Sequence, residues 1–448
     1  MYLLRVTWFQ RANSKNASFG QPLAKGFTMN GNMIIKHAAE LVTCSGSGAK
    51  CGKAMNDLAI QSDRSLLVEE GIIKEIGAFD SLSLRKPLDR YTVIDASGKS
   101  VLPGFVDSHT HLVFGGYRPD EFSWRLRGDS YMDIMQRGGG INSTVKSTRA
   151  ASREDLAASA TRHLNSMLSF GVTTIEGKSG YGLDHDTEIK QLEVMQALNS
   201  THAIDIVPTF LGAHAVPPEY AGQADAFIDF IIDAVLPEVA ERQLAEFCDI
   251  FCEASVFSIE QSRRLLTKAQ SCGLGIKFHA DEIVQLGGAE LAAELKAVSA
   301  DHLLQASDAG IQQLAKTGVI ATLLPGTAFS LKESYARGRF MIDQGCAVAL
   351  ASDFNPGSCF TESIPLIIAL ATLYMNLTVE EAITAFTLNG AAAISREKEI
   401  GSLDVGKQAD IIILEHPSYR FIPYHIGVNS VEKVIKQGHL VVDRSHII

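Results

Sequence analysis

The hydrophobic positions of the chain follow one repeated pattern between residues 101 and 395. A short run rich in Val, Ile and Phe ends in polar residues, and a longer segment follows in which apolar residues recur three and four positions apart. The first feature indicates a buried strand and the second an amphipathic helix. The apolar runs are residues 101–111, 172–182, 204–214, 248–257, 275–282, 297–303, 319–327 and 348–358. The helical segments between them include residues 152–170, 188–197, 261–271 and 308–316.

This alternation predicts the fold class. Eight strands that each precede a helix favour a closed barrel, because such units build a parallel sheet with the helices outside it. An open dinucleotide-binding sheet would need Gly-x-Gly-x-x-Gly directly after an early strand. The glycine cluster at residues 138–140 lacks that spacing and follows a helical pattern. We therefore predict an α/β protein with a TIM-like (β/α)8 barrel over residues 101–395.

The two ends of the chain have a different pattern, in which short strand-like segments are separated by turn residues. Such segments occupy residues 33–43, 65–76, 91–94, 400–415 and 431–443. We expect residues 29–100 and 396–448 to form one small composite β-sandwich domain beside the barrel. Residues 1–28 are polar and aperiodic and form an N-terminal extension without a predicted element. Residues 43–58 look like a loop insertion.

Composition narrows the class of protein. The chain has 448 residues with a formal charge of −11, 46% hydrophobic and 20% charged residues. An acidic balance argues against a protein that coats nucleic acid, and no apolar run approaches the roughly 20 residues that span a bilayer. Seven cysteines in so long a chain are too few for a secreted disulfide framework. The first 14 residues lack the features of an export signal, so we expect a cytoplasmic protein.

Polar residues capable of chemistry stand at the ends of four predicted strands. His109 and His111 end the first strand, and side chains two apart on a strand point the same way. His279 ends the fifth strand, His302 the sixth and Asp353 the eighth. Each of these alone reads as a surface, capping or core polar residue. Together they converge on one barrel mouth, where barrel enzymes place their active sites.

The convergence predicts a metal centre. His109, His111, His279 and Asp353 supply three nitrogens and one oxygen, a set that suits one Zn²⁺ or Fe ion and leaves room for a water. Glu282 lies three residues after His279 and is a candidate proton shuttle. His302 is a candidate to polarise the bond under attack or to hold the nucleophile. A metal-binding or scaffolding barrel without catalysis is the alternative from another class.

The motifs resemble the amidohydrolase superfamily over the chain beyond residue 28. The strand-one sequence PGFVDSHTH, the later histidines and the strand-eight Asp stand in that superfamily's order, and VGKQADIIIL is similar to its β-sandwich segment. Many members bridge two metals with a carboxylated lysine at the end of strand four. Residues 248–257 contain no lysine, so the resemblance implies a mononuclear site.

Within the superfamily, the motifs resemble the imidazolonepropionase family. They read HTHLVFGGYRPDEF, RGGGINSTVKSTR, EGKSGYGLD, FLGAHAVPPEY, KFHADE and SDFNPGS. The resemblance implies hydrolysis of the ring of 4-imidazolone-5-propanoate to N-formimidoyl-L-glutamate in histidine degradation. It implies catalytic roles for Glu282, His302 and Asp353. The substrate ligands that it implies are Arg118, Tyr181, His214, Glu282, Asn355, Gly357 and Ser358.

Chemistry makes these ligands reasonable, and alternatives stay open. The substrate carries a propanoate, and the guanidinium of Arg118 offers a planar fork for a carboxylate. An isolated arginine here would otherwise pair with Asp120 or Glu121. The runner-up activity is another mononuclear amidohydrolase, such as an aminohydrolase of nucleobases or guanidines. A homodimer is the expected assembly.

Overall fold

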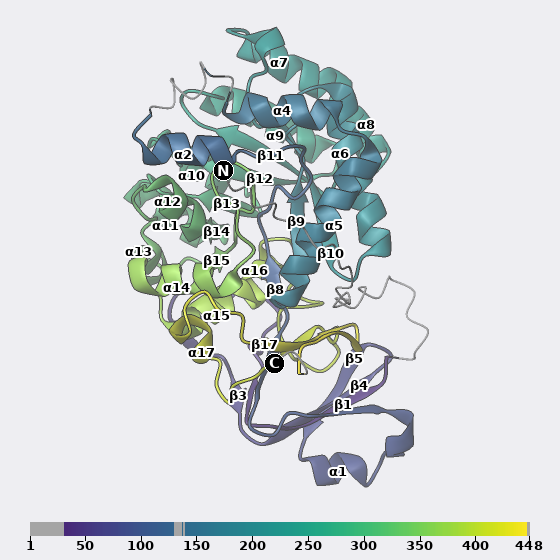
Figure 1. Cartoon of the computed structure of the whole chain (residues 1–448). Helices are drawn as coiled ribbons and strands as arrows, with labels where there is room; N and C mark the ends of the chain where they lie inside the picture. The colour runs from purple at the N-terminus through teal and green to yellow at the C-terminus, as the bar shows by residue number, and fades with distance from the viewer. Residues whose placement is uncertain (1–30, 130–136, 138, 446–448) are drawn as a thin grey trace, which may run out of the picture.

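The computed structural model of the protein describes residues 31–129, 137 and 139–445. Figure 1 shows a barrel ringed by helices, and the purple N-terminal and yellow C-terminal strands lie together below it. The extension predicted over residues 1–28 lies outside the described residues. Within the described part of the chain, no helix combines the length and apolar character that crossing a membrane requires.

The barrel consists of eight parallel strands that neighbour one another in chain order from β8 to β15. Each predicted apolar run overlaps one of them, so the predicted (β/α)8 fold class is confirmed. The strands are β8 (Phe105–Asp107), β9 (Val172–Lys178), β10 (Asp205–Ala213), β11 (Phe247–Cys252), β12 (Gly275–Ala280), β13 (Ser299–His302), β14 (Ile320–Leu323) and β15 (Val348–Leu350).

Helices cover the outside of the barrel, and three of them begin where the sequence supplies a capping box, one of these at Thr378 with Glu381. Ser152 caps α5 together with Asp155, and Ser258 caps α9 together with Gln261, which satisfies backbone N–H groups that have no partner inside the helix. The helical segments are α2 (Pro119–Leu126), α4 (Ile141–Ala150), α5 (Arg153–Ser169), α6 (His185–Thr201), η3 (Pro218–Tyr220), α7 (Ala224–Phe230), η4 (Ile231–Val235), α8 (Leu236–Glu241), α9 (Ile259–Ser271), α10 (Gly288–Glu294), α11 (Asp308–Thr317), α12 (Pro325–Leu331), α13 (Gly338–Asp343), α14 (Ile364–Tyr374), α15 (Val379–Phe386) and α16 (Leu388–Ala392).

Strands from both chain ends form two further sheets that share one apolar core. The first has the order β5-β4-β1-β6, and the second β18-β17-β16-β7-β2-β3. The strands are β1 (Met33–Ala38), β2 (Glu40–Val42), β3 (Ile60–Gln61), β4 (Arg64–Glu69), β5 (Ile72–Gly77), β6 (Thr92–Asp95), β7 (Ser100–Pro103), β16 (Ile411–Leu414), β17 (Val431–Lys436) and β18 (His439–Asp443). Short helical segments accompany them: η1 (Gly52–Asn56), α1 (Phe79–Ser83), η2 (Leu88–Arg90) and α17 (Phe421–Tyr424). The domain boundaries expected at residues 101 and 396 stay a prediction.

The apolar run over residues 101–111 is two strands rather than one. β7 pairs with β16 and β2 in the second of the two sheets built from the chain ends, whereas β8 pairs with β9 in the barrel. Gly104 separates them, and a Cβ at this position would lie 2.4 Å from the Thr173 side chain. The run stays apolar along its length because it leaves one core, which contains Val101, and enters another, which contains Phe105.

The segment 43–58, expected to be a loop insertion, packs under the barrel. It contains η1, in which the Met55 side chain is buried. The Met55 carbonyl oxygen accepts a hydrogen bond from Thr384 Oγ1 (2.8 Å), and the Lys50 amide donates to Asn389 Oδ1 (2.8 Å). These bonds tie the segment to α15 and α16, contacts that residue periodicity does not reveal.

The barrel closes at the residues that directly follow its first and last strands. Asp353 donates its backbone N–H to the His109 carbonyl (3.0 Å), and His111 donates to the Phe354 carbonyl (2.9 Å). Thr110 and Phe354 form a parallel bridge. We call this set, residues 109–111 with 353 and 354, the closing seam. The seam therefore contains three of the predicted metal ligands.

Candidate active site

The four predicted metal ligands converge at the C-terminal end of the barrel strands. The Nε2 atoms of His109 and His111 lie 3.6 and 3.5 Å from Asp353 Oδ1. His279 comes from the opposite side of the barrel, and its Nε2 lies 3.4 Å from His111 Nε2. All four side chains are almost completely buried. Residues that are up to 244 positions apart in the chain, as His109 and Asp353 are, thus meet at one point.

The spacing of these atoms fits one metal ion. Two ligands about 2.1 Å from an ion in tetrahedral geometry stand roughly 3.4 Å apart. Three of the separations among these atoms, His279 to His111 and each of His109 and His111 to Asp353, are 3.4–3.6 Å, and ligand nitrogens of the three histidines lie within 4.8 Å of one another. His109 Nε2 is buried and accepts no hydrogen bond from any described residue. A buried imidazole nitrogen without a partner is costly unless it binds something. The site therefore suits a divalent metal ion.

Two buried aspartates that the sequence analysis missed orient the histidines from beneath. His109 Nδ1 donates to Asp301 Oδ2 (2.6 Å), and His279 Nδ1 lies 3.0 Å from Asp249 Oδ2. A carboxylate on one ring nitrogen keeps the proton there and turns the lone pair of the other nitrogen outward. The available signal was a charged residue inside an apolar strand run, namely Asp249 in CDIF and Asp301 in SADH.

Burial controls the protonation of the cluster. Burial lowers the pKa of His109, His111 and His302 well below the usual value, so these rings are neutral at pH 7 and able to ligate. Burial also lowers the pKa of His214 to about 3. His279 differs, because the Asp249 carboxylate outweighs the effect of burial and raises the pKa of its ring.

Glu282 and His302 face each other beside the ligands. His302 ends β13, and its Nδ1 lies 3.6 Å from Glu282 Oε1. Burial, reinforced by the charge of Asp353, raises the pKa of Glu282 to about 8. A carboxyl whose pKa lies near neutrality can both accept and donate a proton. The pair thus has the chemistry and the location expected of proton-transfer groups.

Two of these residues have a left-handed backbone conformation, which residues other than glycine rarely adopt. His302 has φ 73° and Asp353 has φ 50°. Such left-handed residues carry strain and cluster at functional sites. For Asp353, the conformation is held by the closing seam and by Thr327, whose hydroxyl donates to Asp353 Oδ2 (2.5 Å). Thr327, in α12, is a third residue that the sequence did not reveal, after Asp249 and Asp301.

Arg118 lies at the start of α2 with its guanidinium over Gly357. A Cβ on Gly357 would come within 1.6 Å of Arg118 Nη2. Its ion pair among the described residues is with Glu121, whose Oε2 is 3.6 Å from Arg118 Nη1. Arg118 Nε is buried and donates no hydrogen bond to a described residue. Much of the fork is therefore available to an anion.

Tyr181 and His214 stand on the other side of the ligand cluster. The His214 ring lies almost parallel to that of His111, with centroids 4.9 Å apart, and the Tyr181 ring lies 5.3 Å from that of His214. His214 Nδ1 donates to the Gly180 carbonyl (3.0 Å), which leaves Nε2 as an acceptor. Both predicted substrate residues thus border the metal ligands.

Asn355 differs from the other predicted substrate residues, because its side chain is engaged within its own turn. Its Oδ1 accepts the N–H groups of Gly357 and Ser358, and its Nδ2 donates to the Asp353 carbonyl and to Ser358 Oγ, each at 2.8 Å. The amide therefore fixes the turn after β15. Cys359 next to this turn is buried, and burial raises the pKa of its thiol well above the usual value, as expected of a packing residue.

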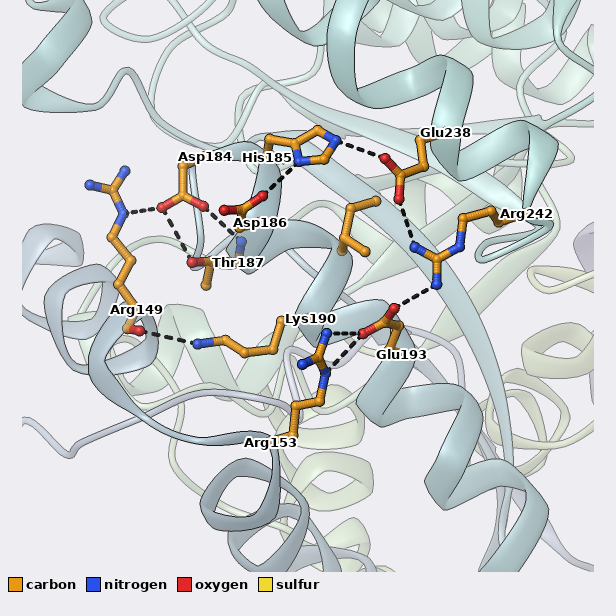
Figure 2. A pocket seen from close by; sticks show the side chains of 11 residues that line it. Arg149, Arg153, Asp184, His185, Asp186, Thr187, Lys190, Glu193, Glu238 and Arg242 are labelled. Carbon is orange, nitrogen blue, oxygen red and sulfur yellow. Dashed lines mark hydrogen bonds and ion pairs between the residues drawn. The ribbon is translucent and has the colours of Figure 1, made fainter.

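A groove of about 840 Å³ lies away from this mouth, between α4, α5, α6 and α8. Its charged groups pair with one another (Figure 2): Arg153 and Arg242 both reach Glu193, and Arg149 reaches Asp184. Lys190 donates to three backbone carbonyls. Because these cations already have partners, the groove is a weaker candidate for an anionic substrate than the barrel mouth.

Known proteins match this chain along most of its length. The family model described as "Amidohydrolase family" matches residues 92–139 and 135–442. The imidazolonepropionase of Clostridium tetani is 60% identical over 416 residues, which cover 93% of this chain and 99% of the relative. That of Parabacteroides distasonis is 56% identical over 411 residues, which cover 92% of this chain and 99% of the relative.

Solved structures of lower identity share the fold. A triazine hydrolase variant has a TM-score of 0.70 at 14% identity and covers 92% of this chain and 95% of its own. An adenosine deaminase from Xanthomonas campestris with bound zinc has a TM-score of 0.63 at 18% identity and covers 93% of this chain and 94% of its own. At these low identities the solved structures show only the barrel fold. The family model and the relatives at 56–60% identity show the family. The chain therefore belongs to the amidohydrolase family and, within it, to the imidazolonepropionases.

Proposed function

We propose that the barrel mouth hydrolyses 4-imidazolone-5-propanoate to N-formimidoyl-L-glutamate. The observation that carries the proposal is the meeting of His109, His111, His279 and Asp353 at ligand spacing beside an anion-binding arginine. Relatives at 56–60% identity that bear the name imidazolonepropionase support the choice of substrate. Water adds to a ring carbon, the carbon–nitrogen bond breaks, and the departing nitrogen takes up a proton.

The ion is proposed to be one Zn²⁺ or iron(II), because three imidazoles and one carboxylate suit both. When bound, such an ion acidifies water, whose pKa falls from about 15.7 toward 7, and so supplies the nucleophile at neutral pH. His109 and His279 present Nε2 because Asp301 and Asp249 occupy their Nδ1 sides. His111 and Asp353 complete the set.

Glu282 is the proposed proton carrier. Its carboxyl group stands at the edge of the ligand cluster, 3.6 Å from the His302 ring, and can move a proton from water to the departing ring nitrogen. His302 is neutral and is proposed to polarise the bond under attack or to hold the nucleophile. Asp353 is the alternative shuttle, since burial raises the pKa of its carboxyl to about 6.

The propanoate is proposed to bind the Arg118 fork, which matches a carboxylate better than a point charge does. Gly357 leaves the space that this guanidinium fills, and Asn355 and Ser358 hold the turn that carries Gly357. Tyr181 offers one hydroxyl to the substrate. His214 is proposed to support the ring carbonyl, where negative charge develops.

The test measures both the turnover of the imidazolone and the metal content of the protein. Purified protein is expected to consume the imidazolone, to form a product with the mass of N-formimidoylglutamate, and to contain one metal ion per chain by elemental analysis. Turnover of nucleobases or guanidines in place of the imidazolone would favour the runner-up activity. Two tightly bound ions per active chain would contradict the mononuclear site, and a metal-loaded protein inactive on all of these would favour a scaffold.

Two expectations about the whole protein belong to this proposal. All seven cysteines are free in the structure, which supports the proposed cytoplasmic location. The proposed assembly is a homodimer, on the general preference of such enzymes for two-fold symmetry. Light scattering of the purified protein measures the assembly, and fractionation of cells measures the location.

A further inference from the structure

Beneath the metal ligands, the barrel interior contains a closed set of five charged side chains. They come from strands β9, β11, β12 and β13, and none of the five exposes any surface. We call them the inner charge cluster: Glu176, Lys178, Asp249, Lys277 and Asp301. Ions removed from water to this extent are costly unless they are paired and hydrogen-bonded. A cluster of this kind therefore requires an explanation beyond packing.

Lys178 is the centre of this cluster. Its Nζ donates to Asp249 Oδ2 (2.7 Å) and Glu176 Oε1 (2.9 Å), and it lies 3.7 Å from Asp301 Oδ2. Asp249 Oδ2 and Asp301 Oδ2 are the same oxygens that meet Nδ1 of His279 and His109. One ammonium thus contacts both carboxylates that hold metal-ligand histidines.

The second buried lysine has different partners. Lys277 Nζ lies 2.9 Å from Glu176 Oε2 and donates to the carbonyls of Ser108 (3.1 Å) and Ala393 (3.2 Å). Glu176 also accepts the Thr209 hydroxyl (2.5 Å) and forms no hydrogen bond to a ligand histidine among the described residues. The two lysines are equally buried, but only Lys178 touches a carboxylate that orients a ligand.

The positive charge of Lys178 compensates the buried negative charges of Asp249 and Asp301. A buried carboxylate is costly unless a cation compensates its charge, and the Lys178 ammonium lies 2.7 Å from Asp249 Oδ2 and 3.7 Å from Asp301 Oδ2. Burial would lower the pKa of the Lys178 ammonium, but the carboxylates of Asp249, Glu176 and Asp301 outweigh burial and raise it. Lys178 is therefore a permanent cation.

We infer that Lys178 is a positioning residue of the metal centre: its ammonium fixes Asp249 and Asp301, and these two carboxylates turn Nε2 of His279 and His109 toward the ion. The inference rests on the metal site of the proposed function. It also accounts for the single ion of the proposed function. His109, Glu176 and Asp301 have the spacing of a second cation site, and the two lysine ammoniums already lie among these carboxylates.

The test compares two buried lysines. Lys178→Met removes the charge and keeps an unbranched side chain, and Lys277→Met is the matched control. Each metal-free protein is titrated with Zn²⁺ against a chromophoric chelator, and Tm is recorded with and without Zn²⁺. We expect Lys178→Met to weaken Zn²⁺ binding about 10- to 100-fold, the usual effect of losing support behind a ligand. Lys277→Met should lower the Tm of the metal-free protein and leave Zn²⁺ affinity within about threefold.

The outcomes separate this inference from the proposed function. Wild-type protein that binds neither Zn²⁺ nor iron(II) contradicts the proposed function itself. Wild-type protein that binds Zn²⁺, together with equal affinities in Lys178→Met and Lys277→Met, overturns only the role of Lys178. In that case the cluster stabilises the barrel and has no bearing on the metal.

A double variant keeps the test decisive if Lys178→Met does not fold. Lys178→Met with Asp249→Asn removes the lysine and one carboxylate together, which restores the charge balance of the buried cluster. We expect this protein to fold and still to bind Zn²⁺ weakly, because His279 has lost its carboxylate. Wild-type affinity in the folded double variant would overturn the inference.

Discussion

Gly357 leaves the space that the Arg118 guanidinium fills, so the position of the proposed anion-binding group depends on the absence of a side chain at residue 357. Arg125 adds to this arrangement, since its Nη2 donates to the Gly357 carbonyl (3.0 Å). Two arginines therefore meet one glycine at the turn after β15. A glycine at this position is required by close approach and not by an unusual φ.

We predict that Gly357→Ala weakens substrate binding and leaves folding largely intact. The added Cβ displaces the Arg118 guanidinium, which is the mobile end of a long side chain. Loss of a charged hydrogen bond costs about 1.5–3 kcal/mol, or roughly 10- to 150-fold in KM. Steady-state kinetics and Tm measure the two effects. Gly48→Ala is the control, because a Cβ at Gly48 meets nothing within 4 Å; an unchanged KM in Gly357→Ala would mean that the propanoate binds elsewhere.

We predict that Glu282→Gln lowers kcat by about 10²–10⁴-fold. The amide keeps the shape of the carboxyl but cannot carry a proton from water to the departing nitrogen. Metal content should stay at the wild-type level, because Glu282 is not among the four proposed ligands. Kinetics at matched metal occupancy test this, with Glu333→Gln as the control, an exposed carboxylate whose charge also acts on Glu282. A near-normal kcat with a raised KM would assign the proton to His302 or Asp353.

At the scale of elements, the loop after β9 is held by α6. Glu188 is a buried residue of α6, and its carboxylate accepts the backbone N–H groups of Gly180 (3.0 Å), Gly182 (2.8 Å) and Leu183 (2.9 Å). The Tyr181 amide donates to Gln191 Oε1 (3.2 Å). The helix thus fixes the loop that carries Tyr181 and the Gly180 carbonyl that holds His214.

We predict that Glu188→Gln raises KM and lowers stability by about 1–3 kcal/mol, the cost of a buried donor left without a partner. The glutamine keeps one acceptor oxygen but turns an NH₂ group toward the Gly180 N–H. KM and chemical denaturation measure the two effects. Glu241→Gln, at the exposed end of α8, is the control. Loss of stability with an unchanged KM would show that the loop with Tyr181 keeps its position without the hydrogen bond from the Gly180 N–H to residue 188.

Much of the site could be predicted because its residues directly follow apolar strand runs. His279, His302 and Asp353 stand where strand ends in a barrel must meet, so their proximity follows from the fold alone. Asp249 and Asp301 were missed because their role depends on which nitrogen of a distant histidine they face. The sequence did not reveal that the run over residues 101–111 divides at Gly104 into β7 and β8. Both strands are apolar, because one packs in the core of the end sheets and the other in the core of the barrel.

At the scale of the whole molecule, the proposed metal centre joins distant parts of the barrel. We predict that chelation lowers Tm by several degrees and that one equivalent of Zn²⁺ restores it. An ion that binds only the folded state at 100 times its Kd adds about 2.7 kcal/mol to the free energy of unfolding. Calorimetry with and without chelator measures the shift, and His111→Ala, which lacks one ligand, should not respond. An equal response of that variant would place the stabilising ion elsewhere.

The closing seam also determines the stage of chain synthesis at which the proposed metal centre can form. His109 and His111 leave the ribosome early, whereas Asp353 is made after three-quarters of the chain, and β16, the partner of β7, is made later still. A nascent chain that ends before residue 353 lacks both the fourth ligand and the backbone that closes the barrel. The four proposed ligands can therefore come together only in chains synthesised beyond the last barrel strand, and termination before that point leaves the proposed hydrolytic centre incomplete.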